Sequence, residues 1–171
     1  MFGIDSKFYE VVSKIADLVV LNLLFVLFSL PIITMGASTT ALYGVTKKMA
    51  ENREGYIFRN FFQLFKENFR QSTVMWIILL VAAMIPTVDL YIINSLEKTV
   101  ITTALKGLML ATALTVLLVF LYAMALQSTF ENTIKNTLKN AFLMGIGYFP
   151  WTLLILLITL LPIILIVLLG K

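Results

Sequence analysis

The sequence predicts an all-α, polytopic membrane protein with four transmembrane helices, one short or partly crossing helix, and juxtamembrane amphipathic helices. Of its 171 residues, 60% are hydrophobic and 13% are charged, against about 45–50% and about 25% in soluble domains. The mean hydropathy of +0.98 agrees with this composition. Four long uncharged runs are rich in Leu, Ile and Val. They lack the ~10-residue alternating pattern of membrane β-barrels, which favours helices.

The uncharged runs place the spans within a single membrane domain covering 1–171. A spanning helix needs about 20 predominantly apolar residues. The predicted spans are residues 15–34, 72–93, 104–127 and 148–169.

The first uncharged run, Leu18 to Thr46, leaves two alternatives open. Its 29 residues exceed one span, but two full spans need about 40. Pro31 and Gly36 interrupt it near the middle. Either the first helix crosses and a cytoplasmic helix follows it, or a short helix over about 37–50 crosses only partly.

Basic residues orient the chain in the membrane of a bacterial cell. Cytoplasmic loops of membrane proteins are enriched in Lys and Arg. The segments 47–70 and 131–139 are therefore predicted to be cytoplasmic, whereas the hairpin tip at Asn94 to Lys98 faces outside. The N-terminus is assigned to the cytoplasm on its lysines. We expect a multi-pass protein of the inner membrane. The six basic residues in the first of these segments are Lys47, Lys48, Arg53, Arg59, Lys66 and Arg70.

Two amphipathic helices are predicted beside the spans, over 56–70 and 131–142. The first has five phenylalanines at helical spacing on one face and three cations on a neighbouring face, which is typical of a helix in the membrane interface. This pattern is compatible with simple anchoring in lipid. It is also compatible with a functional role, either as a docking surface for a partner or as a gate. The candidate lipid or partner contacts are Phe58, Phe62, Phe65, Arg59, Lys66 and Arg70.

Polar residues within the spans form a second candidate site. Asp89 is the only charge in the second apolar run, and an intramembrane carboxylate suggests proton or cation binding. Pro86, one turn earlier, could open the helix to water. The alternative is a hydrated carboxylate near the outer surface. Asn22 and Gln127 complete the candidate site, although such residues also serve as hydrogen bonds between helices.

The composition argues against an ordinary hydrolase or a metalloenzyme and leaves carboxylate chemistry open. The chain has no cysteine and no histidine, and only nine carboxylates. The commonest metal ligands and general bases are therefore missing. We expect no catalytic residues, no metal site and no cofactor, and hence no enzyme. Without a concentrated basic domain, nucleic acid is not an expected partner.

A weak internal repeat relates two juxtamembrane segments, FKENFRQS at 65–72 and IKNTLKNA at 134–141. Each precedes an apolar span, and repeats of this kind occur in transport folds. Any basic helix that enters a membrane can look similar, and this alternative stays open. If the repeat is real, the second unit lacks a return helix. The chain is then a short form or a truncated one, and its last span would favour self-association into a homo-oligomer.

Residues 29–71, SLPIITMGASTTALYGVTKKMAENREGYIFRNFFQLFKENFRQ, resemble the YesL family of bacterial membrane proteins. The matches are closest at Gly36 to Tyr43 and at Gly55 to Gln71, and DLYI at 89–92 is also similar. Members of this family are often encoded beside carbohydrate-uptake transporters and their sensor kinases, and the family has no established activity. The resemblance therefore implies a transporter or kinase of that kind as partner, besides the lipid bilayer.

Together these observations favour a non-enzymatic accessory membrane protein linked to carbohydrate uptake or its sensing. The alternative is a small transporter or channel subunit, which Asp89, Pro86 and the weak repeat favour. Co-purification with a transporter or kinase would distinguish the first hypothesis, and solute flux into vesicles the second.

Overall fold

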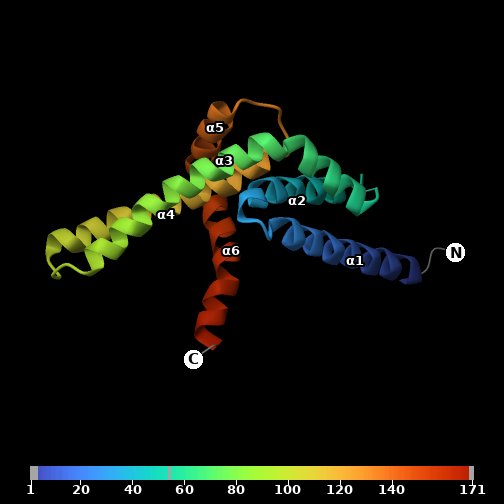
Figure 1. Cartoon of the computed structure of the whole chain (residues 1–171). Helices are drawn as coiled ribbons and strands as arrows, with labels where there is room; N and C mark the ends of the chain where they lie inside the picture. Colours follow the sequence, from blue (N-terminus) through green and yellow to red (C-terminus); the bar gives the residue numbers. More distant parts are fainter. Residues whose placement is uncertain (1–3, 54, 170–171) are drawn as a thin grey trace. The chain divides into compact units, whose positions relative to one another are not determined.

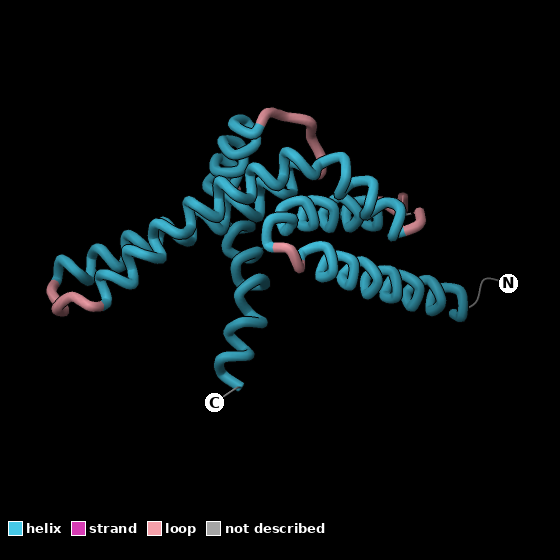
Figure 2. Tube along the Cα trace, in the orientation of Figure 1, coloured by secondary structure: helices cyan, strands magenta, loops and turns pink. Residues whose placement is uncertain are grey.

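The structure is a computed structural model that describes residues 4–53 and 55–169. Every regular element within these ranges is helical, which confirms the predicted all-α class (Figures 1 and 2). The elements in chain order are α1 (Ile4–Ser29), the 3₁₀ turn η1 (Ile32–Thr34), α2 (Met35–Ala50), α3 (Ile57–Asn94), α4 (Val100–Gln127), α5 (Ile134–Gly147) and α6 (Phe149–Leu169).

Three of the described helices are long and apolar enough to cross a membrane. They are Val11–Ser29 within α1, the whole of α3, and the whole of α4. A fourth crossing is present if the bent pair Ile134–Gly147 and Pro150–Ile158 forms one broken span. Side chains such as Leu23, Val81 and Leu110 are exposed along these helices, as expected for surfaces that face lipid. The chain is therefore a multi-pass helical membrane protein.

The predicted interfacial helix at 56–70 and the predicted span at 72–93 form one continuous helix. α3 has 38 residues, which corresponds to about 57 Å at 1.5 Å per residue. A bilayer's hydrocarbon core is about 30 Å thick, so α3 extends beyond it. The helix continues through the buried Pro86 to Asn94. Beside this proline, the Thr87 hydroxyl donates to the carbonyl oxygen of Ala83 at 2.7 Å.

Contacts between residues group the chain into two compact units, which are described separately. The first unit comprises Met1–Ile78 and Met124–Asn132. The second comprises Leu79–Ala123 and Thr133–Lys171. α3 and α4 therefore contribute to both.

In the first unit, α2 returns antiparallel along α1 (Figure 1). At one end of this hairpin, the Ser38 hydroxyl donates to the carbonyl oxygen of Phe25 at 3.0 Å. At the other end, Lys14 Nζ donates to Asn52 Oδ1 at 2.8 Å. The short helix predicted over 37–50 therefore packs against α1, with contacts that run from Lys14 to Phe25.

Small residues on α2 allow α3 to approach it closely. A Cβ added to Gly36 would lie 2.5 Å from the Cβ of Trp76 and 2.6 Å from the carbonyl oxygen of Ser72. A Cβ added to Gly44 would lie 2.8 Å from Cδ1 of Leu64. Close helix approach at small residues is the usual packing mode of membrane helices. The apolar core of this unit combines α1, α2 and the start of α3: Leu21, Leu24, Ala41, Val45, Met49, Ile57 and Phe61.

The second unit contains the rest of α3 and α4, followed by α5 and α6. The hydroxyls of Tyr122 on α4 and Thr152 on α6 lie 2.8 Å apart. Thr152 also donates to the carbonyl oxygen of Gly145 at 3.0 Å. This side chain, 1% exposed, therefore links α4, α5 and α6 at the bend between the last two helices.

Candidate functional site

The three residues of the predicted intramembrane polar site have separate environments. Asn22 is exposed on α1, and its Nδ2 donates to the carbonyl oxygen of Leu18 on the same helix at 2.8 Å. Asp89 is half-buried on α3 and belongs to the second unit. Gln127, at the end of α4 in the first unit, is 6% exposed. Of the three, Gln127 takes part in a hydrogen-bond network with another helix.

That network fixes which way the Gln127 amide points. Asn68 Nδ2 donates to the carbonyl oxygen of Leu64 at 3.0 Å. A backbone carbonyl only accepts, so Asn68 must present its Oδ1 to Gln127. Gln127 Nε2 donates to this oxygen at 3.1 Å. The remaining atom, Gln127 Oε1, is buried and has no hydrogen-bond partner among the described residues.

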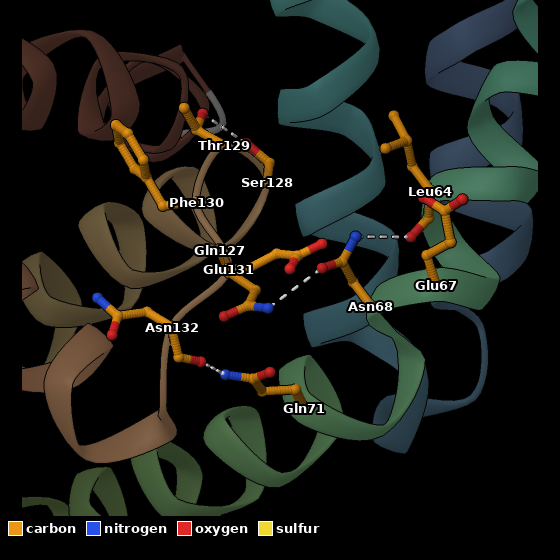
Figure 3. A pocket seen from close by; sticks show the side chains of 10 residues that line it. All are labelled: Leu64, Glu67, Asn68, Gln71, Gln127, Ser128, Thr129, Phe130, Glu131 and Asn132. Atoms are coloured by element: carbon orange, nitrogen blue, oxygen red, sulfur yellow. Dashed lines mark hydrogen bonds between the residues drawn. The ribbon is translucent and has the colours of Figure 1, made fainter.

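Gln127 lines a cavity of about 650 Å³ in the first unit (Figure 3). One wall is a face of α3, whose residues recur at helical spacing. The other wall is the end of α4 and the connection that follows it. Gln71 Nε2 donates to the carbonyl oxygen of Asn132 and so holds this connection against α3. The lining residues are Leu64, Glu67, Asn68, Gln71, Gln127, Ser128, Thr129, Phe130, Glu131 and Asn132.

The hydroxyls in the lining donate to the backbone. Ser128 Oγ donates to the carbonyl oxygen of Ala125 at 2.7 Å, and Thr129 Oγ1 donates to the same oxygen at 3.3 Å. A hydroxyl has one hydrogen, so both groups offer only lone pairs to the cavity.

Glu67 and Glu131 are the charged residues of the lining, and both are exposed. Glu67 Oε1 accepts from Gln63 Nε2 at 2.9 Å. No lysine or arginine lines the cavity, which gives its wall a formal charge of −2 from these two carboxylates. Among the residues that the structure describes, no group of three or more His, Cys, Asp or Glu side chains could hold a metal ion.

The phenylalanines of the predicted aromatic face of α3 differ in how far they are buried. Phe61 is completely buried in the core. Phe65 is half-buried, and its ring centre lies 5.0 Å from that of Phe28 on α1. Phe58 and Phe62 stay 61% and 47% exposed and stack with their ring centres 6.5 Å apart. Phe28 also meets Phe62, with ring centres 6.2 Å apart. It therefore contacts three rings of the face, of which Phe61 is buried and Phe62 stays accessible.

The predicted cations of this segment, Arg59, Lys66 and Arg70, are all exposed on α3. In the ranges 4–53 and 55–169, none of them forms an ion pair with an acidic side chain. By contrast, Arg53 pairs with Glu51 in the connection between α2 and α3. The first half of α3 thus presents positive charges that have no acidic partner among the described residues, beside two exposed rings.

Most of the cavity could not be predicted from the sequence. Glu67, Asn68 and Gln71 share a helical face with Leu64, and their spacing of three and four residues was the available signal. Pairing this face with Gln127 joins positions 59 residues apart in sequence. No local pattern indicates such a contact.

The fold and these surfaces define a multi-pass helical membrane protein, and comparison with known proteins shows what it is similar to. Residues 18–90 match a family described as "Protein of unknown function, DUF624". The chain is also similar to "Uncharacterized protein YesL" of Bacillus subtilis (strain 168), with 29% identity over 116 residues. The chain is therefore similar to the YesL family, in agreement with the resemblance seen in the sequence.

The similarity to this relative covers only part of each chain. The matched part is 67% of this chain and 56% of the Bacillus subtilis protein, so the chain spans little more than half of that relative. No solved structure matches the chain. The family match at 18–90 includes α2 and the residues of α3 that pack against it.

Proposed function

We propose that this chain is a non-enzymatic accessory protein of the bacterial inner membrane that acts beside a carbohydrate-uptake transporter or its sensor kinase. The observation that supports the proposal most directly is the exposed face of the first half of α3. This docking face comprises Phe58, Phe62, Arg59, Lys66 and Arg70.

The docking face has the composition of a protein-binding surface. Aromatic residues and arginine are enriched in interfaces. Its cations have no acidic partner among the described residues, so an acidic segment of a partner would complement them. Phe28 packs against Phe65 and Phe61 behind the face. The face is therefore held on the α1–α2 hairpin, and docking would require little ordering of the chain.

The choice of partner rests on the resemblance to the YesL family, whose members are often encoded beside carbohydrate-uptake transporters and sensor kinases. The basic segment at 47–70 favours the cytoplasmic side for the docking face. The partner would therefore contribute a cytoplasmic acidic surface.

Site-specific photo-crosslinking tests this function. A photoreactive amino acid at Phe62, in cells that express the chain at native level, should capture a subunit of a carbohydrate transporter or a sensor kinase. The matched control is Leu110, which is 60% exposed on α4 and lies outside the docking face. Capture of lipid alone at Phe62, or the same protein set from both positions, would contradict the proposal and favour simple anchoring.

A second candidate function, a small transporter or channel subunit, is favoured by one observation. Asp89 is a half-buried carboxylate one turn after the buried Pro86, and intramembrane carboxylates often serve ion or proton pathways. Solute or cation flux into proteoliposomes that contain only this chain would support it. Flux that Asp89→Asn abolishes would place that residue in the pathway.

A further inference from the structure

We infer that the docking face binds one α-helix of its partner, which carries acidic side chains in one row and large apolar side chains in the row beside it. The inference rests on the proposed function, because it specifies what the partner presents to that face. Two features of the first unit support it. One is the arrangement of the exposed side chains on α3, and the other is a hollow at the end of the face.

The exposed side chains on the first half of α3 form two adjacent rows. Phe58 and Phe62 are about one helical turn apart, and Phe69, which is 40% exposed, continues their row beyond the docking face. The second row follows the first by one position at each end, so the two run side by side along the helix. Each row extends for roughly 16 Å at about 1.5 Å per residue. The members of the second row are Arg59, Lys66 and Arg70.

An α-helix can match two straight, adjacent rows. Side chains that recur at helical spacing share one face of a helix, so a second helix can present an apolar row and an acidic row together. Successive side chains of a β-strand point to opposite sides. A strand would therefore present a single row to α3, which can meet the rings or the cations but not both.

Charge determines which polar side chains the partner helix carries. Arg59, Lys66 and Arg70 have no acidic partner among the described residues. Carboxylates of Asp or Glu form charge-assisted hydrogen bonds with such cations. Charge pairs at an exposed surface contribute more to specificity and association rate than to affinity. The apolar row of the partner helix must therefore supply most of the affinity through its contacts with the exposed rings.

A hollow of about 460 Å³ lies at the Phe58 end of the docking face. Its lining is aromatic or aliphatic apart from Asp17 and Gly55. Binding surfaces commonly provide such a hollow for one apolar anchor residue of the partner. The last large apolar side chain of the partner helix would occupy it. The lining residues are Asp17, Val20, Gly55, Tyr56, Ile57 and Phe58.

The experiment measures binding of a fluorescent designed peptide to the full chain in nanodiscs of phosphatidylcholine, by fluorescence anisotropy. The peptide has about 20 residues and a hydrocarbon staple that keeps it helical, since isolated helices of this length are only marginally stable. Its leucines and glutamates have the spacing of the two rows on α3. A control peptide has the same composition in an order that breaks both rows. The designed peptide should bind saturably and at least about tenfold more tightly than the control.

Variants test whether the peptide binds at the docking face. Lys66→Glu should weaken binding about tenfold or more, because it places like charges opposite each other. A peptide whose central glutamate is replaced by lysine should reverse this loss. Phe62→Ala should weaken binding about fivefold or more, since it removes an exposed ring. Both positions are exposed, so neither change should affect folding. Lys98→Glu, which reverses an exposed charge elsewhere, should leave Kd unchanged.

The inference is overturned by any of three results. One is equal binding of the designed and the control peptide. Another is an equal effect of Lys66→Glu and Lys98→Glu, which would indicate attraction to the protein's surface in general. The last is complete loss of peptide binding when the nanodiscs contain phosphatidylglycerol, which would identify anionic lipid as the occupant of the face.

The outcomes also separate this inference from the proposed function. If the peptide binds as expected but a photoreactive residue at Phe62 captures no transporter or kinase, the proposed function fails and the inferred helix-binding chemistry holds. If such a protein is captured but the peptide does not bind, the inference fails and the proposed function holds.

Discussion

Gly36 on α2 faces Ser72 on α3 so closely that a β-carbon on the glycine would lie 2.6 Å from the serine's carbonyl oxygen. The side chain of Thr40, one turn further along α2, lies 2.9 Å from the Ser72 hydroxyl in the buried interior. These contacts give the small-residue stretch of α2 a structural role, because it fixes α2 against α3. They also lie within the part of the chain that matches the DUF624 family.

The close approach predicts a strong effect of one added methyl group. Gly36→Ala should destabilise the protein by about 1–3 kcal/mol, since α2 must shift away from backbone atoms of α3. Thermal unfolding in detergent, followed by circular dichroism, measures this. Gly107→Ala is the matched control. A Cβ there meets nothing within 4 Å, and alanine favours the helix by up to about 1 kcal/mol.

The buried hydroxyl pair predicts a smaller loss. Thr40 Oγ1 contacts the Gly36 carbonyl, Ser72 Oγ and Met124 Sδ at 3.0, 2.9 and 3.4 Å. Thr40→Val keeps the shape but removes the hydroxyl, and should cost roughly 1–2 kcal/mol in the same assay. Thr112→Val, whose hydroxyl donates only to its own helix on an exposed face, should be nearly silent. Equal effects at both positions would show that the inter-helix bond contributes nothing.

The bond between Lys14 and Asn52 leads to a prediction of sidedness. The first part of α1 meets the end of α2 there. Both should lie on the cytoplasmic side, because the adjoining connection is basic. The chain has no native cysteine, so single cysteines report without background. Cysteines at Tyr9, Asn52 and Asn60 should resist an impermeant thiol reagent in intact cells, and one at Asn94 should react. Labelling at Asn52 without labelling at Asn94 would reverse the orientation.

The variant Asp89→Asn distinguishes the two candidate functions. If the chain acts through its docking face, Asp89→Asn should insert normally and capture the same partner as the wild type. The change removes the charge and keeps the shape. A variant that still captures its partner but loses a flux measured in proteoliposomes would support the transporter alternative instead.

Composition and hydropathy were sufficient to predict the fold class, since every described element is a helix. The continuity of α3 across residue 71 was harder to predict. The polar and apolar halves of α3 were predicted as separate helices, because their environments differ. Nothing between them stops a helix, however. No glycine or proline lies between Ile57 and Ile85, and α3 is continuous.

Residue patterns could not reveal partners across the fold. The phenylalanine spacing places Phe61 with its neighbours on one face, but only the folded structure shows that Phe61 is buried and Phe62 is accessible. Phe28 contacts both rings. The sequence identifies Gln127 only as a polar residue at a span end. Its pairing with Asn68, and the cavity that results, depend on how α4 returns to α3.

The most direct test of the proposed function is quantitative proteomics of the natively tagged chain, extracted gently from its own membrane. The wild type is compared with Lys66→Glu, which reverses one charge on the docking face, and with Lys98→Glu, which reverses an exposed charge elsewhere. If the docking face binds such a partner, a carbohydrate transporter or sensor kinase co-purifies with the wild type and with Lys98→Glu, and Lys66→Glu reduces its recovery severalfold. Equal recovery with all three chains, or recovery of no such protein, would contradict it.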